Sequence, residues 1–476
     1  MYIKRFLLFL LLFVNQSEAQ VITTEKPTLS QAVSLKDNIP VSEINIPVEI
    51  NLQPFFNMAE KQVDTLFTSP GYPTQWVQEG CDTRYKYAFR RSPLQFNFTN
   101  NKLTIAFVGY YKIIGSTRGC LNGTILTPWS PECKCGFEEG ERRVNVSFTI
   151  TPVVYKNFVI KMLVQRNEPV PIDKCTVCFW GQDITPTIMA SLKKELDVTK
   201  ADMEKNYGTI DLKPYVQNVW KMLNSPYPIT EMGWLRIYPE KLWLSRLYGM
   251  GNRLQLTIGM AAKPVIRFEN DIQPAATMPD LSNARSANGF NINVDVMLNY
   301  DSLSAILTKN IKGKEFVFSK GMIRKKFVFN SCQLMGTSTA NRLIVVVNFS
   351  GTDKGTFYLT ARPAYDTTTK TLAMEDVAFD VKTKDALLKT AKWLFSKRIT
   401  SEIEKMARYD LSTLMNDVVI QINQQLNREL IKGVRSSGSL NNISIDVIYP
   451  REELLVLRAN AKGTLSVNIS GVDFGL

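Results

Sequence analysis

The chain contains 476 residues with a formal net charge of +13, and histidine occurs at no position. The absence of histidine excludes Ser-His-Asp triads, Cys–His nucleophile pairs and histidine-ligated metal sites. The positive charge favours anionic partners such as lipid headgroups or nucleic acid. Hydrophobic residues make up 45% of the chain, which is ordinary for a globular protein and sufficient for more than one core.

The N-terminus predicts a secretory signal peptide at 1–19. Lys4 and Arg5 precede an apolar run at 6–14, which is too short to span a bilayer, and Ser17-Glu18-Ala19 supplies small residues for cleavage. No later stretch is long and apolar enough for a transmembrane helix. We therefore expect an exported protein, periplasmic, associated with the cell envelope or secreted, and export argues against nucleic acid as a partner. A polar linker at 20–40 precedes the predicted fold.

The first half begins with a predicted strand that leads into a helix. Apolar residues alternate with polar ones from 46 to 52, and an apolar pattern with helical spacing follows from 55 to 66. Strands rich in aromatic residues come next, including a hairpin at 94–107, and helical patterns follow at 188–196 and 212–223. Short basic clusters such as Arg90-Arg91 are typical of solvated surfaces.

The second half repeats this order of elements. A strand is predicted at 292–298, a helix at 303–311 and a hairpin at 343–359. Two amphipathic helices then follow, with apolar stripes at 387–406 and 411–430. Each half therefore predicts a strand, a helix, a sheet, long helices and final strands.

Two short stretches occur twice and indicate a duplicated domain. One is the alternating strand that opens each half, at 46–52 and again 246 positions later at 292–298. Ile237-Tyr238-Pro239 and Ile448-Tyr449-Pro450 lie 211 positions apart, and the alternating apolar residues after them keep that offset. Those residues are Leu254, Leu256 and Ile258 in the first copy and Leu465, Val467 and Ile469 in the second. We predict an α+β fold with two tandem related domains, at 41–280 with cysteine-rich insertions and at 281–476.

Six of the seven cysteines lie in the first half. They are Cys81, Cys120, Cys133, Cys135, Cys175 and Cys178, whereas Cys332 stands alone. Export favours disulfides, although the sequence does not give their pairing. The last four of the six could instead hold zinc through thiolates. Cys332 is expected to be a buried free thiol.

Several of these features together resemble a known family. The signal peptide, the two-half layout, Cys81-Asp82-Thr83-Arg84-Tyr85 and the helices before Ile448-Tyr449-Pro450 resemble a secreted bacterial family, domain of unknown function 4403. That family is similar to the tubular lipid-binding (TULIP) superfamily, which includes bactericidal/permeability-increasing protein. The resemblance implies that in each domain a curved antiparallel sheet wraps around a long amphipathic helix and encloses a tunnel for acyl chains. The cysteine cluster departs from the superfamily pattern.

The leading hypothesis is an exported, non-catalytic lipid-binding or lipid-transfer protein with an elongated apolar cavity. We expect a lipid or another apolar ligand, an anionic membrane surface as a further partner, and no cofactor, metal or catalytic residue. The alternative is a structural or adhesive envelope module with a packed core, since core and tunnel lining look alike in sequence. A carboxylate-pair hydrolase is the third hypothesis, but Glu138-Glu139 and Glu452-Glu453 have diverging side chains on a strand. The candidate cavity residues are Val48, Ile50, Leu52, Leu254, Leu256, Ile258, Val294, Val296, Leu298, Leu387, Ala391, Leu394, Phe395 and Ile399.

Overall fold

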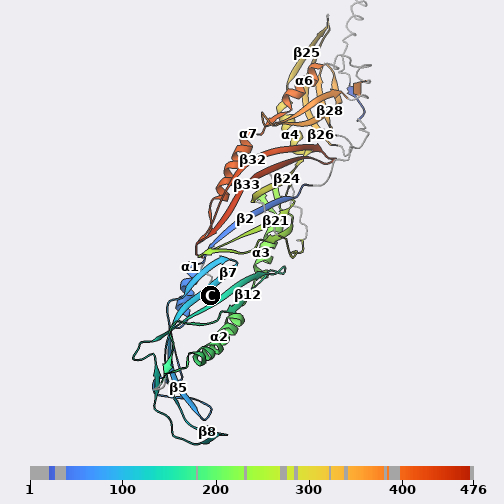
Figure 1. Ribbon diagram of the computed structural model, residues 1–476. Helices are drawn as coiled ribbons and strands as arrows, with labels where there is room; N and C mark the ends of the chain where they lie inside the picture. The colour runs from blue at the N-terminus through green and yellow to red at the C-terminus, as the bar shows by residue number, and fades with distance from the viewer. Residues whose placement is uncertain are drawn as a thin grey trace, which may run out of the picture.

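The computed structural model is elongated, and its strands run obliquely along most of its length (Figure 1). It describes residues 21–26, 39–177, 181–229, 233–267, 276–283, 288–320, 323–336, 341–379, 383–384 and 397–471. The predicted signal peptide, Cys178, and the predicted cavity residues Leu387, Ala391, Leu394 and Phe395 lie outside the described residues. Within them the fold is mostly β-sheet with six helices, as expected for an α+β protein.

The helices and strands fall into three regions along the molecule. The helices are α1 (Gln53–Gln62), α2 (Thr185–Tyr207), α3 (Lys213–Asn224), α4 (Tyr300–Ile311), α6 (Lys397–Met406) and α7 (Ser412–Leu426). One end holds β3 (Leu66–Thr68), β4 (Val77–Glu79), β5 (Thr83–Arg91), β6 (Gln95–Asn100), β7 (Lys102–Thr117), β8 (Cys120–Leu121), β9 (Thr124–Ile125), β10 (Cys133–Cys135), β11 (Arg142–Val154), β12 (Val159–Arg166), β13 (Val170–Pro171), β14 (Thr176–Val177), β15 (Gln182–Asp183) and β16 (Thr209–Asp211).

The middle and the other end complete the molecule. The middle holds β2 (Ser42–Asn51), β17 (Tyr227–Ile229), β18 (Gly233–Arg236), β19 (Pro239–Leu244), β20 (Tyr248–Gly251), β21 (Arg253–Ala262), β22 (Val265–Arg267), β23 (Leu281–Ser282), β24 (Gly289–Asn299), β31 (Glu429–Ile431), β32 (Val434–Pro450) and β33 (Leu454–Ile469). The other end, here the distal sheet, holds β1 (Val21–Thr23), β25 (Glu315–Lys320), β26 (Ile323–Met335), β27 (Leu343–Gly351), β28 (Lys354–Asp366), β29 (Thr371–Phe379) and β30 (Arg408–Asp410).

The distal sheet packs against α4 and α6 over a dense aromatic core. Phe327, Phe349 and Phe357 are fully or almost fully buried, and the ring centroids of Phe327 and Phe349 lie 5.0 Å apart. Ile399 of α6 is fully buried in the same core. This end of the molecule is therefore a closed core in which side chains fill the space between sheet and helices.

The predicted linker at 20–40 includes the short strand β1. β1 pairs in parallel with β28, and Ile22 is buried in the distal core. Gly355 lies opposite Ile22, where a Cβ atom would collide with the Ile22 carbonyl. The buried Ile22, the pairing of 21–23 with 354–356 and the hydrogen bond from Thr24 to the Thr356 carbonyl thus attach this segment. A strand of three residues is too short for a periodic pattern to predict.

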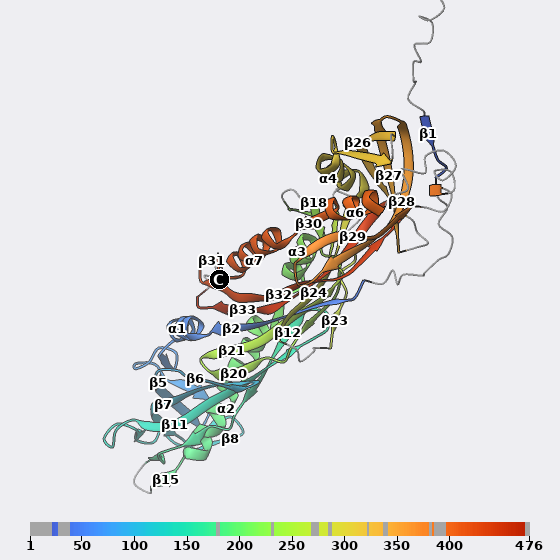
Figure 2. The same ribbon diagram turned by 90° about the horizontal axis from the view of Figure 1, so that it is seen from above.

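The central sheet contains strands from both halves of the chain. β2 pairs along one edge with β21, from Ser42 opposite Ala262 to Asn51 opposite Arg253. Its other edge pairs with the start of β24 at 43–45 and with the end of β33 at 48–50. β33 in turn pairs with β24 and with β32 (Figure 2). The two predicted domains therefore share one continuous sheet.

The two copies of the repeated stretch occupy different registers. Leu254 lies opposite Ile50, so the last strand of the first half pairs with its opening strand. In the second half β33 also pairs antiparallel with the opening strand β24, but through residues 454–463. Val467 and Ile469 extend beyond that contact and pair with Val48 and Ile50 of β2. The order of strands is alike in both halves, whereas the residues that meet differ.

Disulfides are present in the first half, as predicted for an exported chain. Cys81 is bonded to Cys120, and Cys135 to Cys175, with Cα atoms 6.1 Å and 5.7 Å apart. Cys133 is also disulfide-bonded. Because Cys135 and Cys175 are bonded to each other, they are not available as thiolates for zinc. Cys332 is a buried free thiol, as predicted, and burial raises its pKa to about 12.

Candidate functional site

One side of the central sheet carries a continuous apolar surface, here called the central apolar face. Side chains alternate along a strand, and residues directly opposite each other share a side. The register therefore places the apolar residues of β2, β21 and the end of β33 on the same side. They are Ile44, Ile46, Val48 and Ile50 of β2, Leu254, Leu256, Ile258 and Met260 of β21, and Leu465, Val467 and Ile469 of β33.

Most of this face is only partly covered. Val48 is buried, with 6% of its surface exposed, but Ile258 is 45% exposed. Ile46, Ile50, Leu254, Leu256 and the three β33 residues are half-buried. A strand with one apolar side normally buries that side against another layer. The central apolar face therefore offers apolar surface that the described residues do not fully cover.

Helix α3 covers the β21 end of this face with one of its sides. Asp211 accepts the backbone N–H of Lys213 at 2.9 Å, which satisfies a free donor in the first turn. The buried Trp220 then packs in a cluster that includes Met260 of the central apolar face. On its other side Tyr215, Val219 and Met222 are 71%, 53% and 61% exposed. Apolar residues thus lie on both sides of α3, and only one side has a partner among the described residues.

Helix α7 runs along the outer edge of β32. Asn423 accepts the backbone N–H of Leu440 at 2.8 Å, and Asn427 accepts that of Gly438 at 3.1 Å. The apolar side chains of α7 that are not exposed are only half-buried, and no residue of this helix is fully buried. Polar contacts to the strand edge therefore hold α7, whereas its apolar residues, including the exposed Ile420, are not enclosed.

The predicted cavity residues of β24 lie on the same side of the sheet, closer to the distal core, because Phe290 lies opposite Ile44 and side chains alternate from there. Val296 and Leu298 of β24 pack against the distal core, in which Ile399 is completely buried. Val294 is half-buried opposite Ala459, and Leu52 is half-buried just before α1. The structure therefore separates the predicted set into residues of a packed core and residues of the central apolar face.

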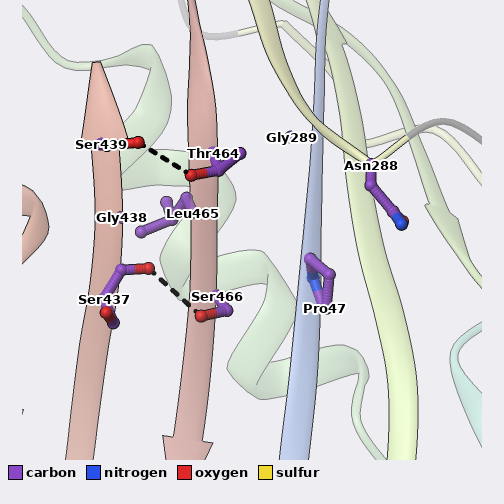
Figure 3. A pocket seen from close by; sticks show the side chains of 9 residues that line it. All are labelled: Pro47, Asn288, Gly289, Ser437, Gly438, Ser439, Thr464, Leu465 and Ser466. Atoms are coloured by element: carbon purple, nitrogen blue, oxygen red, sulfur yellow. Dashed lines mark hydrogen bonds between the residues drawn. The ribbon is translucent and has the colours of Figure 1, made fainter. Parts of the chain in front are cut away.

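The opposite side of the central sheet is polar and contains an open cavity of about 450 Å³ (Figure 3). Ser437, Ser439, Thr464 and Ser466 line it together with Pro47, and Ser466 donates a hydrogen bond to the Ser437 carbonyl at 3.2 Å. A second cavity of about 600 Å³ lies among residues 152–156, 244–247 and 281–283. None of the predicted cavity residues lines either cavity. These two cavities are therefore not the elongated apolar cavity expected from the sequence.

A buried ion pair connects the strands on the polar side. Arg458 donates to both carboxylate oxygens of Asp295, at 2.7 Å and 2.9 Å, and the hydrogen bonds to Asp295 raise the pKa of Arg458. Tyr449, from the second Ile-Tyr-Pro, donates to Asp295 at 3.4 Å, and burial raises its pKa. These contacts satisfy one another, which is the pattern of a structural pair. In the part of the chain that the structure describes, no acidic or cysteine cluster could hold a metal ion.

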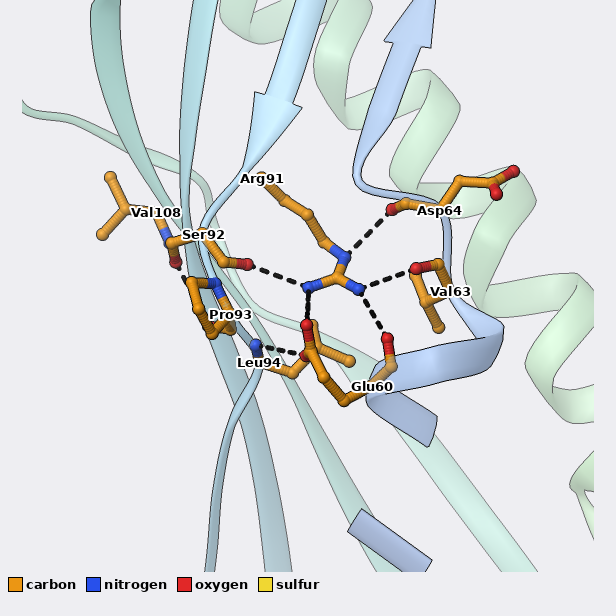
Figure 4. A network of polar contacts seen from close by, with 8 residues as sticks. All are labelled: Glu60, Val63, Asp64, Arg91, Ser92, Pro93, Leu94 and Val108. Carbon is orange, nitrogen blue, oxygen red and sulfur yellow. Dashed lines mark hydrogen bonds and ion pairs between the residues drawn. The ribbon is translucent and has the colours of Figure 1, made fainter. Parts of the chain in front are cut away.

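A buried arginine anchors α1, which continues from β2 (Figure 4). The Arg91 side chain donates to the Glu60 carboxylate at 2.9 Å and 3.0 Å and to the carbonyls of Glu60, Val63 and Asp64. Arg91 is only 3% exposed, so the prediction of a solvated Arg90-Arg91 cluster is wrong for this residue. The free carbonyls at the end of α1 supply the partners that burial requires. Sequence spacing carries no signal for this network, because Glu60 and Arg91 lie on separate elements.

A family model matches most of the chain, whereas the similar solved structures are only distant. The family model described as "Domain of unknown function (DUF4403)" matches residues 40–469. No curated protein matches the chain. Among solved structures, the P47 protein of Clostridium botulinum E1 is 9% identical, with 88% of this chain and 98% of that one covered and a TM-score of 0.22.

Two further solved structures show the same level of similarity. A lipopolysaccharide binding protein is 11% identical, with 91% of this chain and 99% of that one covered and a TM-score of 0.22. P47 from Clostridium botulinum A2 is 9% identical, with 88% and 96% covered and a TM-score of 0.20. Such low TM-scores support no conclusion about the ligand or the tubular architecture. Within the described residues, no helix is both long and apolar enough to cross a membrane.

Proposed function

The chain belongs to the DUF4403 family. We propose that it is an exported protein that binds lipid without catalysing a reaction. The partly covered central apolar face is the observation that carries this proposal. An acyl chain presents only apolar surface, so it would cover Leu256, Ile258 and Val467 without leaving a polar group unpaired. The proposed site is thus an open face between sheet and helices, in place of the enclosed tunnel expected from the sequence.

The helices provide the second support for this proposal. α3 is held to the sheet through one side and α7 through polar contacts at the edge of β32. Neither contact requires the apolar residues between the helices and the sheet to be packed. A ligand can enter such a space by a small movement of α3 or α7, whereas entry into the distal core would require separating side chains that are fully buried.

Export is supported by the disulfides, which persist in oxidising compartments. The predicted signal peptide supports the same location, and the net charge of +13 favours an anionic membrane as the source or acceptor of the lipid. A non-catalytic role is supported by the complete absence of histidine and by the paired state of the buried Asp295 and Arg458.

The competing candidate is a structural module without a ligand, and the packed distal core favours it for that end of the molecule. Native mass spectrometry and lipid extraction of purified protein separate the two candidates. We expect bound lipid in the protein as isolated, or binding of a fluorescent phospholipid after delipidation. Protein that carries no lipid and binds no phospholipid would overturn the lipid-binding proposal and favour the structural module.

A matched pair of variants locates the site. Ile258 on the central apolar face and Val447 on the opposite side are 45% and 42% exposed, so they differ mainly in the side they occupy. Ile258→Asn should lower the amount of bound phospholipid several-fold, because it places an amide against the acyl chain. Val447→Asn should leave the amount unchanged. Equal loss in both variants, or in neither, would contradict the proposed face.

A further inference from the structure

A short hairpin projects from the end of the molecule opposite the distal sheet (Figure 1). Its apolar side chains are exposed. β8 and β9 pair around Asn122 and Gly123, whose positive φ angles of 48° and 83° form a tight turn. Leu121, Ile125 and Leu126 are 64%, 54% and 62% exposed. Three large apolar residues within six positions of one projecting turn form a concentrated apolar tip, whereas single exposed apolar residues are common on protein surfaces.

Several bonds fix this tip to the body of the molecule. The disulfide between Cys81 and Cys120 joins the first hairpin residue to the segment before β5. Arg118 donates to the Cys81 carbonyl at 2.6 Å, and the Gly119 N–H donates to the Thr127 hydroxyl at 2.6 Å. The hairpin is therefore held in a position that keeps its apolar side chains exposed, which argues against a loosely attached loop.

Behind the tip, cations and tryptophan rings alternate in a row. The guanidinium of Arg118 lies 4.2 Å from the centroid of Trp129, and that of Arg84 lies 4.5 Å from the same ring. Arg84 also lies 4.4 Å from the centroid of Trp76, and the Lys86 amine lies 4.6 Å from it. Each tryptophan ring thus contacts two cations, and Arg84 contacts both rings, so the positive groups are held close together.

These cations keep their charge free for an external partner. Among the described residues no carboxylate forms an ion pair with Arg84, Lys86 or Arg118. The neighbouring acidic residues, Glu79 and Asp82, are exposed to solvent. Rings cannot neutralise a positive charge as a carboxylate does, so the row remains positive next to the apolar tip.

We propose that this end of the molecule docks on the surface of a lipid bilayer that contains anionic lipids. The apolar tip would enter the boundary between headgroups and acyl chains, and the tryptophans would lie at headgroup depth, where their amphipathic rings are favoured. The row of cations would meet the lipid phosphates, and each cation near an anionic surface strengthens binding about fivefold. Insertion of the apolar tip and attraction of the cations to lipid phosphates would act at the same end of the molecule. Together they would bind the membrane more strongly than either would alone.

Flotation of the intact protein with vesicles tests the proposal. We expect binding to vesicles of phosphatidylglycerol and phosphatidylcholine in equal parts, and weak binding to phosphatidylcholine alone. The double variant Leu121→Asn/Ile125→Asn should bind the anionic vesicles weaker by roughly tenfold or more, because two apolar side chains no longer enter the bilayer. The matched double variant Leu163→Asn/Val198→Asn, at residues 51% and 57% exposed outside the hairpin, should bind like the wild type.

Quenching of tryptophan fluorescence keeps the proposal testable if the hairpin variant folds poorly. Brominated phosphatidylcholine in the anionic vesicles should quench the wild type, and Trp129→Phe should remove much of that quenching. Unaltered binding of the hairpin variant, equal binding to both vesicles, or absence of quenching in the wild type would overturn the proposal. Inorganic phosphate that competes fully with the vesicles would also overturn it, since an anion site would then explain the binding. Lipid held at the central apolar face is measured without vesicles, so the two proposals can fail separately.

Discussion

The distal sheet and the central sheet bury their apolar residues to very different extents. In the distal core, Phe327, Phe349, Phe357 and Ile399 are fully or almost fully buried and touch one another or their neighbours directly. On the central apolar face, Leu256 and Val467 are half-buried and Ile258 is 45% exposed. The chain packs a fully buried core at the distal sheet. The partial exposure of the central apolar face is therefore specific to the central sheet and not general to the protein. Four experiments measure this contrast, beginning with the substitution that we expect to cost the most stability.

The largest effect is expected in the distal core. Phe357→Ala should lower the free energy of unfolding by about 3–5 kcal/mol, because it removes a buried ring and leaves a cavity. Chemical denaturation followed by circular dichroism measures this change. Val317→Ala, in the same sheet at a residue 36% exposed, serves as the control and should cost less than about 1 kcal/mol. Similar small values for both variants would show that the distal core is not closed.

The anchor of α1 should come next. Arg91→Ala removes the guanidinium that donates to the Glu60 carboxylate and to four backbone carbonyls, and it should cost about 2–3 kcal/mol. This is below the range for a fully buried pair because Glu60 is partly exposed. Its neighbour Arg90 forms an exposed ion pair with Glu141, so Arg90→Ala should cost less than about 1 kcal/mol. If the two variants unfold at the same denaturant concentration, burial of Arg91 contributes nothing to stability.

A smaller effect is expected on the central apolar face. Leu256→Ala should cost about 1 kcal/mol in the delipidated protein, because the side chain is only half removed from water. Addition of phospholipid should raise the melting temperature of the wild type more than that of the variant. A cost as large as that of Phe357→Ala would mean that this face is packed like the distal core and would remove the contrast between the two regions.

The smallest effect is a change of stability with pH. It is expected at the anchor of α1, which contains the Glu60 carboxylate, and not in the distal core around Phe327, which is apolar. Burial alone would raise the pKa of Glu60, but the Leu94 N–H and Arg91 hold it below the ordinary value of 4.5. A lowered pKa in the folded state stabilises the protein above that value, and this contribution is lost as the pH falls through the folded pKa. Glu60→Gln should therefore be less stable than the wild type at neutral pH and approach it below pH 4.5.

The control for the pH experiment is the same substitution in the Arg91→Ala background. In that background Arg91 no longer lowers the pKa of Glu60, and only the Leu94 N–H still does. Glu60→Gln should therefore change the pH dependence of stability less than it does in the wild type. A difference between wild type and Glu60→Gln that stays constant across this pH range would contradict the assigned role of Glu60.

The sequence predicts local elements well because their signals are local. Alternation at 46–52 and helical spacing at 411–430 correspond to β2 (Ser42–Asn51) and α7 (Ser412–Leu426). The register is not local: nothing in the pattern shows that Ile50 meets Leu254 on one edge and Ile469 on the other. Burial of Arg91 also escapes prediction, because it depends on carbonyls at the end of a helix far along the chain. Residues of the distal core and of the central apolar face are equally apolar in sequence. Ile399 and Ile258 differ only in how far other parts of the fold cover them, which the sequence does not show.

The pairing of β2 with both β21 and β33 also sets an order of events during synthesis. β2 is made near the start of the chain and β33 at its end, so the central sheet cannot be completed until the last strand has emerged. The disulfide-bonded end uses segments made earlier and can form first, whereas the distal core also contains Leu455 and Leu457 of β33 and is completed only with that strand. Until then β2 keeps one unpaired edge, which is open to pairing with other chains. A chain that lost its final strand would retain a folded disulfide-bonded end beside an unfinished and aggregation-prone middle and an incomplete distal core.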